Sequence, residues 1–224
     1  MLNKSDKKIK IGIIGAAGYT ASELLRILKS HPEVEITSMV SKSQTGKYVT
    51  DIHQDLFELG ERKFVSNLAK VDVIFLCGGH GASKDFLEAP TNRSALHSEV
   101  KIIDLSHDYR LKGDHSFVYG LSEFFAESIA KSNKIANPGC FATCIQLAIT
   151  PLAKHQKLNS DIHITAITGS TGAGQSPSKT THFSWRQNNI SAYKTFSHQH
   201  ELEINQTLKL MQPSWTGRLC WVPL

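Results

Sequence analysis

The sequence predicts an α/β fold in which a doubly wound parallel sheet is followed by an α+β domain. Over the first 138 residues, short apolar and β-branched segments alternate with stretches of helical periodicity. This alternation requires crossover connections between parallel strands. After residue 139 the pattern changes to a helix, a strand and a loop rich in glycine, serine and threonine. We therefore expect two domains, 1–138 and 139–224.

The first predicted strand is Ile9–Ile14, a short apolar run that ends at the glycine-containing stretch Gly15–Gly18. From Tyr19 to Lys29 the apolar residues recur at i, i+3, i+4 and i+7, which is the spacing of one helix face. His31-Pro32 ends this helix.

Further strands are expected where short apolar segments recur, at Val34–Val40, Val71–Cys77, Lys101–Ser106 and Lys134–Ala136. Beyond Gly139 the predicted elements are a helix, a strand and a loop, at Cys140–Lys154, Ile162–Thr168 and Gly169–Gly174.

The charge pattern suits small anionic ligands better than nucleic acid. Twenty-five basic and 20 acidic residues give a formal charge of +5, and the basic residues are scattered except at Lys7, Lys8 and Lys10. No apolar run approaches the ~18 residues that a membrane span needs, so we expect no membrane partner. The charged amino terminus has no signal-peptide core, which predicts a cytoplasmic location.

Metal binding is not expected. The four cysteines form no CxxC motif, and they do not provide two pairs at the spacing of zinc ligands. The 11 histidines include no HExxH motif.

The turn after the first strand matches the G-x-x-G-x-x-[G/A] form of the dinucleotide fingerprint, with Gly15, Gly18 and Ala21 at the key positions. The first glycine permits a tight turn, the second permits close approach of a pyrophosphate, and the small third residue allows helix–strand packing. The alternative is an ordinary glycine turn, but the flanking strand and helix favour a Rossmann-like dinucleotide site. The expected cofactor contacts are Gly15, Ala16, Ala17, Gly18, Tyr19 and Thr20.

The end of the second strand predicts which dinucleotide binds. An NAD site places Asp or Glu there to hold the ribose 2′-hydroxyl. This chain has Ser41, Lys42 and Ser43 instead. Two hydroxyls and a cation accommodate a 2′-phosphate, so NADP is the expected cofactor.

Cys140 is the candidate nucleophile. It follows Asn137-Pro138-Gly139 and begins an apolar helix, where the partial positive charge of the helix start favours the thiolate. We expect Cys77, Cys144 and Cys220 to be buried and inert. A thiolate beside NADP indicates one reaction class: an acyl group forms a thioester, and a hydride converts it to an aldehyde.

Several motifs occur in the order found in N-acetyl-γ-glutamyl-phosphate reductases, and together they span nearly the whole chain. These motifs are Gly15–Leu24, Asp104–Leu111, Tyr119–Glu123, Asn137–Thr143 and Gly169–Gly174. The cysteine and Gly-Ala-Gly motifs are shared in outline with aspartate-semialdehyde dehydrogenase. The Gly-Tyr-Thr and Tyr-Gly-Leu-Ser-Glu motifs point to the arginine-biosynthesis enzyme, which this sequence therefore resembles.

The resemblance implies NADPH-dependent reduction of an N-acyl-γ-glutamyl phosphate to the 5-semialdehyde through a Cys140 thioester. In the family's His-Arg-His-x-Pro-Glu motif, His200 would be the general acid/base and Glu203 would orient it. His198 would line the acyl-phosphate site. Arg110 and Asn137 would bind substrate, and the loop residues Ser170, Gly172 and Gly174 would contact the nicotinamide end of the cofactor.

This sequence departs from the family in three ways, the first of which is Leu202 in place of the motif's proline. Gln199 stands where the family has arginine, which leaves the acyl group open between acetyl, succinyl and others. The chain also stops at Leu224, where the family's chains continue, so the second domain is expected to be incomplete. The resemblance further implies a homo-oligomer, a dimer or a tetramer. Two alternatives remain at this point: aspartate-semialdehyde dehydrogenase, and a catalytically inactive NADP-binding protein.

Overall fold

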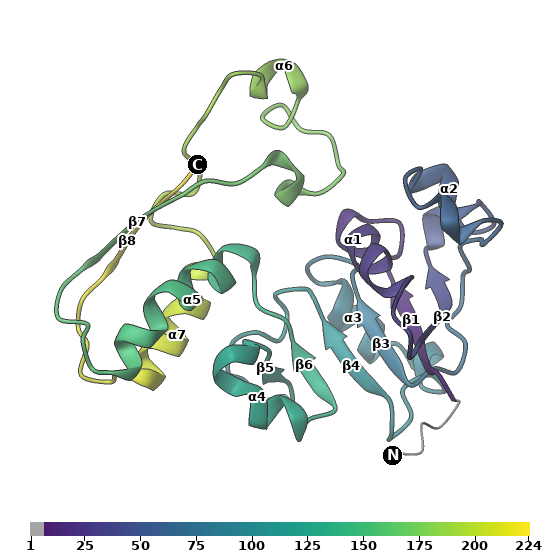
Figure 1. Ribbon diagram of the computed structural model, residues 1–224, viewed down its shortest axis with the longest axis horizontal. Coiled ribbons are helices and arrows are strands. Elements are labelled where there is room, and N and C mark those ends of the chain that lie inside the picture. Colours follow the sequence, from purple (N-terminus) through teal and green to yellow (C-terminus); the bar gives the residue numbers. More distant parts are fainter. Residues whose placement is uncertain (1–6) are drawn as a thin grey trace. The chain divides into compact units, whose positions relative to one another are not determined.

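A computed structural model describes residues 7–224 (Figure 1). The chain divides into two compact units, Met1–Asn137 and Pro138–Leu224. Within residues 7–224, no helix is long and apolar enough to cross a lipid bilayer.

The first unit is built on a six-stranded parallel sheet with the strand order β2-β1-β3-β4-β6-β5. From β1 the chain moves to β2 on one side and then to β3 on the other, so the sheet is doubly wound, as predicted. The strands are β1 (Ile9–Ile14), β2 (Val34–Val40), β3 (Val73–Leu76), β4 (Lys101–Asp104), β5 (Val118–Tyr119) and β6 (Lys134–Ala136).

Both faces of the sheet are covered, as expected for parallel strands. Ile11 and Ile13 of β1 pack with Leu25 in one apolar cluster, and Ile74 and Ile102 belong to a second cluster. The α-helices of this unit are α1 (Tyr19–Leu28), α2 (Val49–Ile52), α3 (Ala82–Glu88) and α4 (Ser122–Ala130). Short 3-10 turns occur at η1 (Lys42–Gln44), η2 (Phe57–Leu59) and η3 (Pro90–Asn92).

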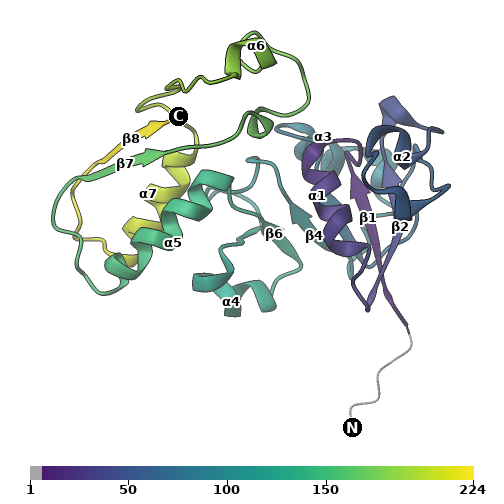
Figure 2. The same ribbon diagram turned by 45° about the horizontal axis from the view of Figure 1, so that its top comes forward.

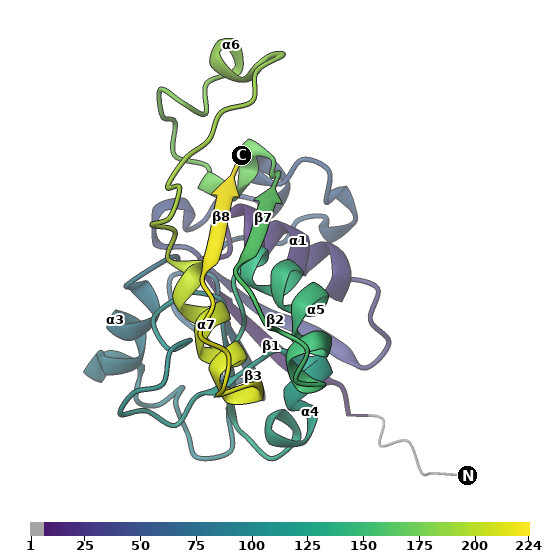
Figure 3. The same cartoon turned by 90° about the vertical axis from the view of Figure 1, so that its left-hand side faces the viewer.

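The second unit pairs two helices with a two-stranded parallel sheet. Its elements are α5 (Cys140–Lys154), β7 (Ile162–Ala166), η4 (Ser170–Ala173), α6 (Phe183–Arg186), α7 (His200–Met211) and β8 (Leu219–Pro223). Helices α5 and α7 lie alongside each other (Figure 2), and β7 and β8 run parallel (Figure 3). Alternate residues of β8, including Leu219 and Trp221, face a core that also contains Ile204 and Leu208 of α7.

Candidate functional site

The turn Gly15–Gly18 is fixed at the carboxyl end of the sheet. The backbone N–H groups of Gly15 and Ala16 donate to the carbonyl of Val40 at 3.0 and 2.9 Å. Gly15 has φ +77°, and a Cβ there would lie 2.6 Å from Gly78 Cα. Both the conformation and the space therefore require glycine. The turn is held between the ends of β2 and β3.

The start of α1 is suited to an anion. Gly18 is its N-cap and supplies no side-chain cap, and the first turn of this helix contains no acidic residue. Its first backbone N–H groups can therefore serve a phosphate, assisted by the helix dipole. Tyr19 and Thr20 are exposed beside them. A dinucleotide pyrophosphate fits this arrangement.

A buried histidine supports the same turn. His53 is 4% exposed, and its Nε2 lies 2.8 Å from the carbonyl oxygen of Ala16. It follows the short helix α2, 37 residues along the chain from Ala16. No motif marks His53, so only the folded chain reveals this contact.

Ser41, Lys42 and Ser43 lie immediately beyond β2, next to the Val40 carbonyl that anchors the glycine turn. The hydroxyl oxygens of Ser41 and Ser43 are 3.5 Å apart. Ser41 is buried, whereas Lys42 and Ser43 are exposed. The structure therefore brings the two predicted groups of cofactor contacts in the first unit to one edge of the sheet.

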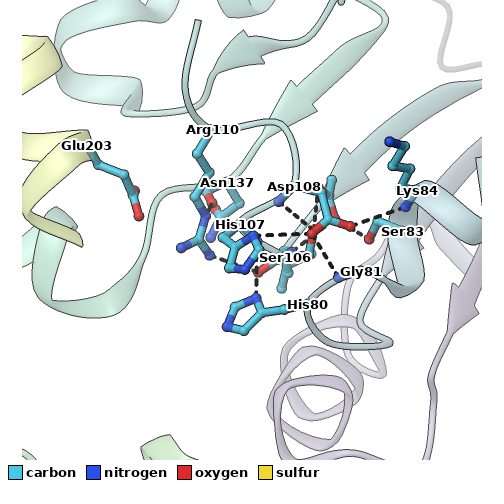
Figure 4. Close-up of polar contacts among 12 residues, drawn as sticks. His80, Gly81, Ser83, Lys84, Ser106, His107, Asp108, Arg110, Asn137 and Glu203 are labelled. Carbon is cyan, nitrogen blue, oxygen red and sulfur yellow. Dashed lines mark hydrogen bonds and ion pairs between the residues drawn. The ribbon is translucent and has the colours of Figure 1, made fainter. Parts of the chain in front are cut away.

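Two carboxylates, Asp104 at the end of β4 and Asp108 in the loop after it, form a network that was not predicted from the sequence (Figure 4). Asp104 is fully buried, and its Oδ1 accepts from Ser83 Oγ at 2.5 Å and from the N–H of Ser106 at 2.9 Å. Asp104 Oδ2 accepts from Ser106 Oγ at 2.8 Å. Asp108 reaches the start of α3, where its Oδ1 accepts from the N–H of Gly81 at 2.8 Å. The network joins the loop after β4 to α3.

Arg110 and Asn137, both predicted to bind substrate, are in contact: the Arg110 side chain reaches the backbone of Asn137. Arg110 is only 6% exposed, so its guanidinium lies inside the unit and not on the surface. Its Nε donates to the carbonyl of Asn137 and its Nη2 to the carbonyl of Leu105, each at 2.8 Å. These bonds tie together the segments that leave β4 and β6 (Figure 4).

Cys140 is the first residue of α5, as predicted, and it is exposed. Gly139 is the N-cap and provides no side-chain hydrogen bond. The hydroxyl of Thr143 donates to the Gly139 carbonyl at 2.9 Å. A thiol at this position belongs to the first turn of a 15-residue helix, where backbone N–H groups have no partner within the helix.

His200 and Glu203 lie at the start of α7, against the residue that precedes Cys140. Oε2 of Glu203 accepts from the backbone N–H of Gly139 at 3.0 Å, and Oε1 lies 3.9 Å from His200 Nε2. A Cβ on Gly139 would lie 2.2 Å from His200 Nε2, so the imidazole packs directly on this glycine. Both side chains are buried. The second unit thus assembles His200, Glu203 and the Cys140 helix start at one place.

His198 is buried in an aromatic cluster next to His200 and does not lie on the surface. Its ring centroid lies 4.6 Å from those of His200 and Trp221 and 5.8 Å from that of Tyr193. Burial, together with the nearby Lys194 charge, lowers the pKa of His198 to about 4. His198 is therefore neutral at pH 7.

The other cysteines differ in part from expectation. Cys144 is exposed, so the prediction that it is buried is wrong: one turn beyond Cys140, it faces away from the α5 core. Cys220 is half-buried. Burial and the Asp104 charge raise the pKa of Cys77 to about 12.

The predicted nicotinamide contacts Ser170, Gly172 and Gly174 lie in or next to the exposed 3-10 turn η4 of the second unit. Gly174 ends this turn with φ +85°, a conformation that favours glycine. In the part of the chain that the structure describes, no three His, Cys, Asp or Glu side chains gather as metal ligands would.

The fold recurs in solved structures. Aspartate semialdehyde dehydrogenase II from Vibrio cholerae superposes with a TM-score of 0.70 at 17% identity, over 98% of this chain and 71% of that one. The enzyme from Candida albicans, solved with NADP, gives a TM-score of 0.65 at 16% identity, over 96% and 68%. At such identities the likeness shows the fold alone.

Curated relatives match far more closely. N-acetyl-gamma-glutamyl-phosphate reductase from Parabacteroides distasonis is 52% identical over 219 residues, 96% of this chain and 67% of that protein. The protein of that name from Christiangramia forsetii is 53% identical over 96% of this chain and 66% of its own length. This chain therefore spans about two thirds of the length of these relatives.

Two family models also match, the semialdehyde dehydrogenase NAD binding domain over residues 10–132 and the semialdehyde dehydrogenase dimerisation domain over residues 140–223. Each falls within one unit of the structure. Together with the relatives at half identity, these matches show that the chain belongs to the N-acetyl-gamma-glutamyl-phosphate reductases of the semialdehyde dehydrogenase family.

Proposed function

We propose that the protein reduces an N-acyl-γ-glutamyl phosphate to the N-acyl-glutamate 5-semialdehyde with NADPH and releases phosphate, as a step of arginine biosynthesis. The observation that carries this proposal is the exposed Cys140 at the start of α5, with His200 and Glu203 packed against the residue before it. The reductases that share half of its residues support the choice of substrate class.

In the proposed mechanism, the Cys140 thiolate attacks the γ-carbonyl carbon and forms a tetrahedral adduct. Backbone N–H groups at the start of α5 are suited to hold the oxyanion. The adduct expels phosphate and leaves a thioester on Cys140. NADPH, when bound, supplies a hydride. The resulting thiohemiacetal breaks its C–S bond, which releases the aldehyde and regenerates the thiolate.

His200 is the proposed general acid/base. It would supply the proton that leaves with the phosphate and regain one from solvent. It would then donate that proton to the thiohemiacetal oxygen and take it back as the C–S bond breaks. Its place is defined by contacts on two sides, Gly139 and the carboxylate of Glu203. In this scheme the neutral His198 lines the acyl-phosphate side without adding charge, and Arg110 and Asn137 bind substrate. Ser170, Gly172 and Gly174 contact the nicotinamide end.

The proposed cofactor is NADP rather than NAD, because Ser41, Lys42 and Ser43 stand where a carboxylate would hold the ribose hydroxyl. Titration of the chain with NADPH and with NADH, followed by fluorescence on one preparation, tests this. NADPH should bind the tighter, and K42A should reduce the difference. Equal affinities, or NADH binding tighter, would refute the assignment of Ser41–Ser43 to the 2′-phosphate.

The substrate is tested in the reverse direction, with NADP and phosphate, on the protein as its gene encodes it. We expect oxidation of an N-acyl-glutamate semialdehyde and no turnover of aspartate semialdehyde. A comparison of N-acetyl and N-succinyl substrates identifies the acyl group, which Gln199 leaves open. Aspartate-semialdehyde dehydrogenases match only in fold, at 17% identity or below, so this alternative is not favoured.

We also infer a homo-oligomer located in the cytoplasm. The match of residues 140–223 to a dimerisation domain supports self-association. Light scattering coupled to size-exclusion chromatography would separate a dimer or tetramer from a monomer, and a monomeric mass at micromolar concentration would contradict the inference. Fractionation of cells tests the location.

A further inference from the structure

Asp108 has a buried carboxylate that accepts hydrogen bonds from the backbone of a segment distant in the sequence. Its side chain is 6% exposed. Oδ1 accepts from the N–H of Gly81 at 2.8 Å, and Oδ2 accepts from the N–H of Lys84 at 3.2 Å. Hydrogen bonds to an ionised carboxylate are stronger than neutral ones. Asp108 therefore holds both ends of the turn that begins α3 (Figure 4).

The segment that Asp108 holds, Gly78–Gly81, has little conformational preference of its own. Three of its four residues are glycine, and Gly79 and Gly81 have φ of +91° and +82°. Glycine loses more conformational freedom on folding than any other residue, so such a segment needs external contacts to stay in one conformation. The Asp108 bonds supply contacts of this kind.

A second contact acts at the same place. The N–H of His107 donates to Nδ1 of His80 at 3.2 Å, and the two imidazole rings stack with centroids 4.1 Å apart. His107 Nδ1 also lies 3.2 Å from Asp108 Oδ1. The loop after β4 is thus fastened to Gly78–Gly81 through Asp108 and through the histidine pair.

This segment forms part of the wall of the glycine turn that suits a pyrophosphate. Gly78 Cα would lie 2.6 Å from a Cβ on Gly15, and the N–H of Cys77 donates to the Ile14 carbonyl at 2.8 Å. Strands β1 and β3 are the neighbours between which the winding direction of the sheet reverses. Ligands of doubly wound folds bind at this switch point, beyond the carboxyl ends of the strands.

We propose that Asp108 is a positioning residue for cofactor binding, holding Gly78–Gly81 against the Gly15 turn before the dinucleotide arrives. This inference rests on the proposed use of NADPH. Without the Asp108 bonds the segment is held at the wall less firmly, although the histidine pair remains. More of its ordering must then accompany binding, at a cost in affinity. Asp108 itself need not touch the cofactor.

The test is D108N, which keeps the size of the side chain but replaces one acceptor oxygen with a donor. One of the two N–H groups, of Gly81 or Lys84, then loses its partner. We expect the Kd for NADPH, titrated by fluorescence on the full 224-residue chain, to rise about tenfold. Hydrogen exchange at Gly81 and Lys84 should become faster in the same variant.

Two controls separate positioning from general loosening of α3. Asn92 donates from Nδ2 to the Phe86 carbonyl at 2.9 Å near the other end of that helix, so N92A removes a bond there without touching Gly78–Gly81. Its Kd for NADPH should stay within about twofold of wild type even if the melting temperature falls. D85N removes an exposed carboxylate from the same helix and should change neither quantity.

An unchanged Kd in D108N, or an equal increase in N92A, would overturn the proposal. Absence of NADPH binding by the wild-type chain would instead refute the proposed cofactor and this inference together. Should D108N fail to fold, D108E takes its place: it keeps the charge, but its longer side chain cannot meet both amides in the same geometry. D108E should then show the rise in Kd, and wild-type affinity in D108E would count against the proposal.

Discussion

The backbone N–H of Gly139 donates to Oε2 of Glu203 at 3.0 Å, across 64 residues of sequence. Gly139 is the N-cap of α5, and Glu203 lies in the first turn of α7. This bond joins the starts of the two helices that provide Cys140 and His200. It gives Glu203 a role in placing the proposed nucleophile as well as the imidazole.

Removal of the Glu203 carboxylate should destabilise the second unit. E203A leaves the buried Gly139 N–H without this acceptor, which costs roughly 1–3 kcal/mol. For a chain of this size the melting temperature should fall by several degrees. E203Q retains an acceptor oxygen and should lose less. Thermal unfolding followed by circular dichroism measures both, with E201Q on the same helix as a control that should remain near wild type.

The contact between Gly139 and His200 predicts a non-additive pair of substitutions. In G139A the new methyl would lie 2.2 Å from His200 Nε2, and such overpacking costs about 1–3 kcal/mol. H200A removes the atom that the methyl meets. The double variant should therefore lose less stability than the sum of the single losses, as measured by urea unfolding. Additivity within about 0.5 kcal/mol would contradict this steric account.

The elements with strong local signals could be predicted from the sequence, several of them to the residue. Strands Ile9–Ile14, Val34–Val40 and Lys134–Ala136 and helix Cys140–Lys154 have the predicted bounds. Each is a largely apolar segment bounded by polar, charged or glycine residues. The predicted strand 71–77 proved shorter, Val73–Leu76, with two residues fewer at its start and one fewer at its end, where the chain turns into the glycine segment.

Other elements are defined by distant partners and could not be predicted in this way. Helix α3 begins where Asp108 accepts from Gly81 and Lys84, and no residue of the helix itself caps this start. Strand β5 has two residues and exists because it pairs with β6. Among the site residues, by contrast, the glycine turn and Cys140 could be predicted because each lies in a recognisable sequence motif. The contacts by which His53, Asp104 and Asp108 hold neighbouring segments in place could not be predicted, because they join residues that are distant in the sequence.

His198 predicts a specific pH dependence of stability. Its pKa is about 4 in the folded protein and near 6.5 in an unfolded chain, because burial disfavours the charged ring. The unfolded state therefore binds the proton more tightly, so the stabilisation by the neutral ring is complete above pH 6.5. It is lost progressively as the pH falls from 6.5 toward 4.

H198Q should flatten the dependence of melting temperature on pH between 4 and 6.5 relative to wild type. H163Q, which removes an exposed histidine of β7 in the same unit, should leave the wild-type slope. In NMR titrations the His198 ring should stay neutral down to about pH 5. Equal slopes in H198Q and wild type would show that His198 titrates alike in both states.

Three cysteines should separate by reactivity and by effect on turnover. Cys140 and Cys144 are exposed, so both should be alkylated by iodoacetamide at pH 8 and found by mass spectrometry. Cys77 should remain unmodified in the folded protein, because its pKa near 12 leaves almost no thiolate at that pH. Labelling of Cys77 as fast as Cys144 would show that this burial is not maintained in solution.

Of the two exposed cysteines of α5, only Cys140 should be required for turnover. In the protein as its gene encodes it, C140S should lose reductase activity while keeping NADPH affinity, because serine is nearly isosteric but far less nucleophilic at neutral pH. C144S should retain activity, with a stability change within about 0.5 kcal/mol because the side chain is exposed. Iodoacetamide should inactivate C144S as it does wild type, and saturating acyl phosphate should slow that inactivation by covering Cys140. Activity surviving in C140S, or inactivation that requires Cys144, would move the reactive centre one turn along α5. It would also remove the basis for placing His200 and Glu203 beside the nucleophile.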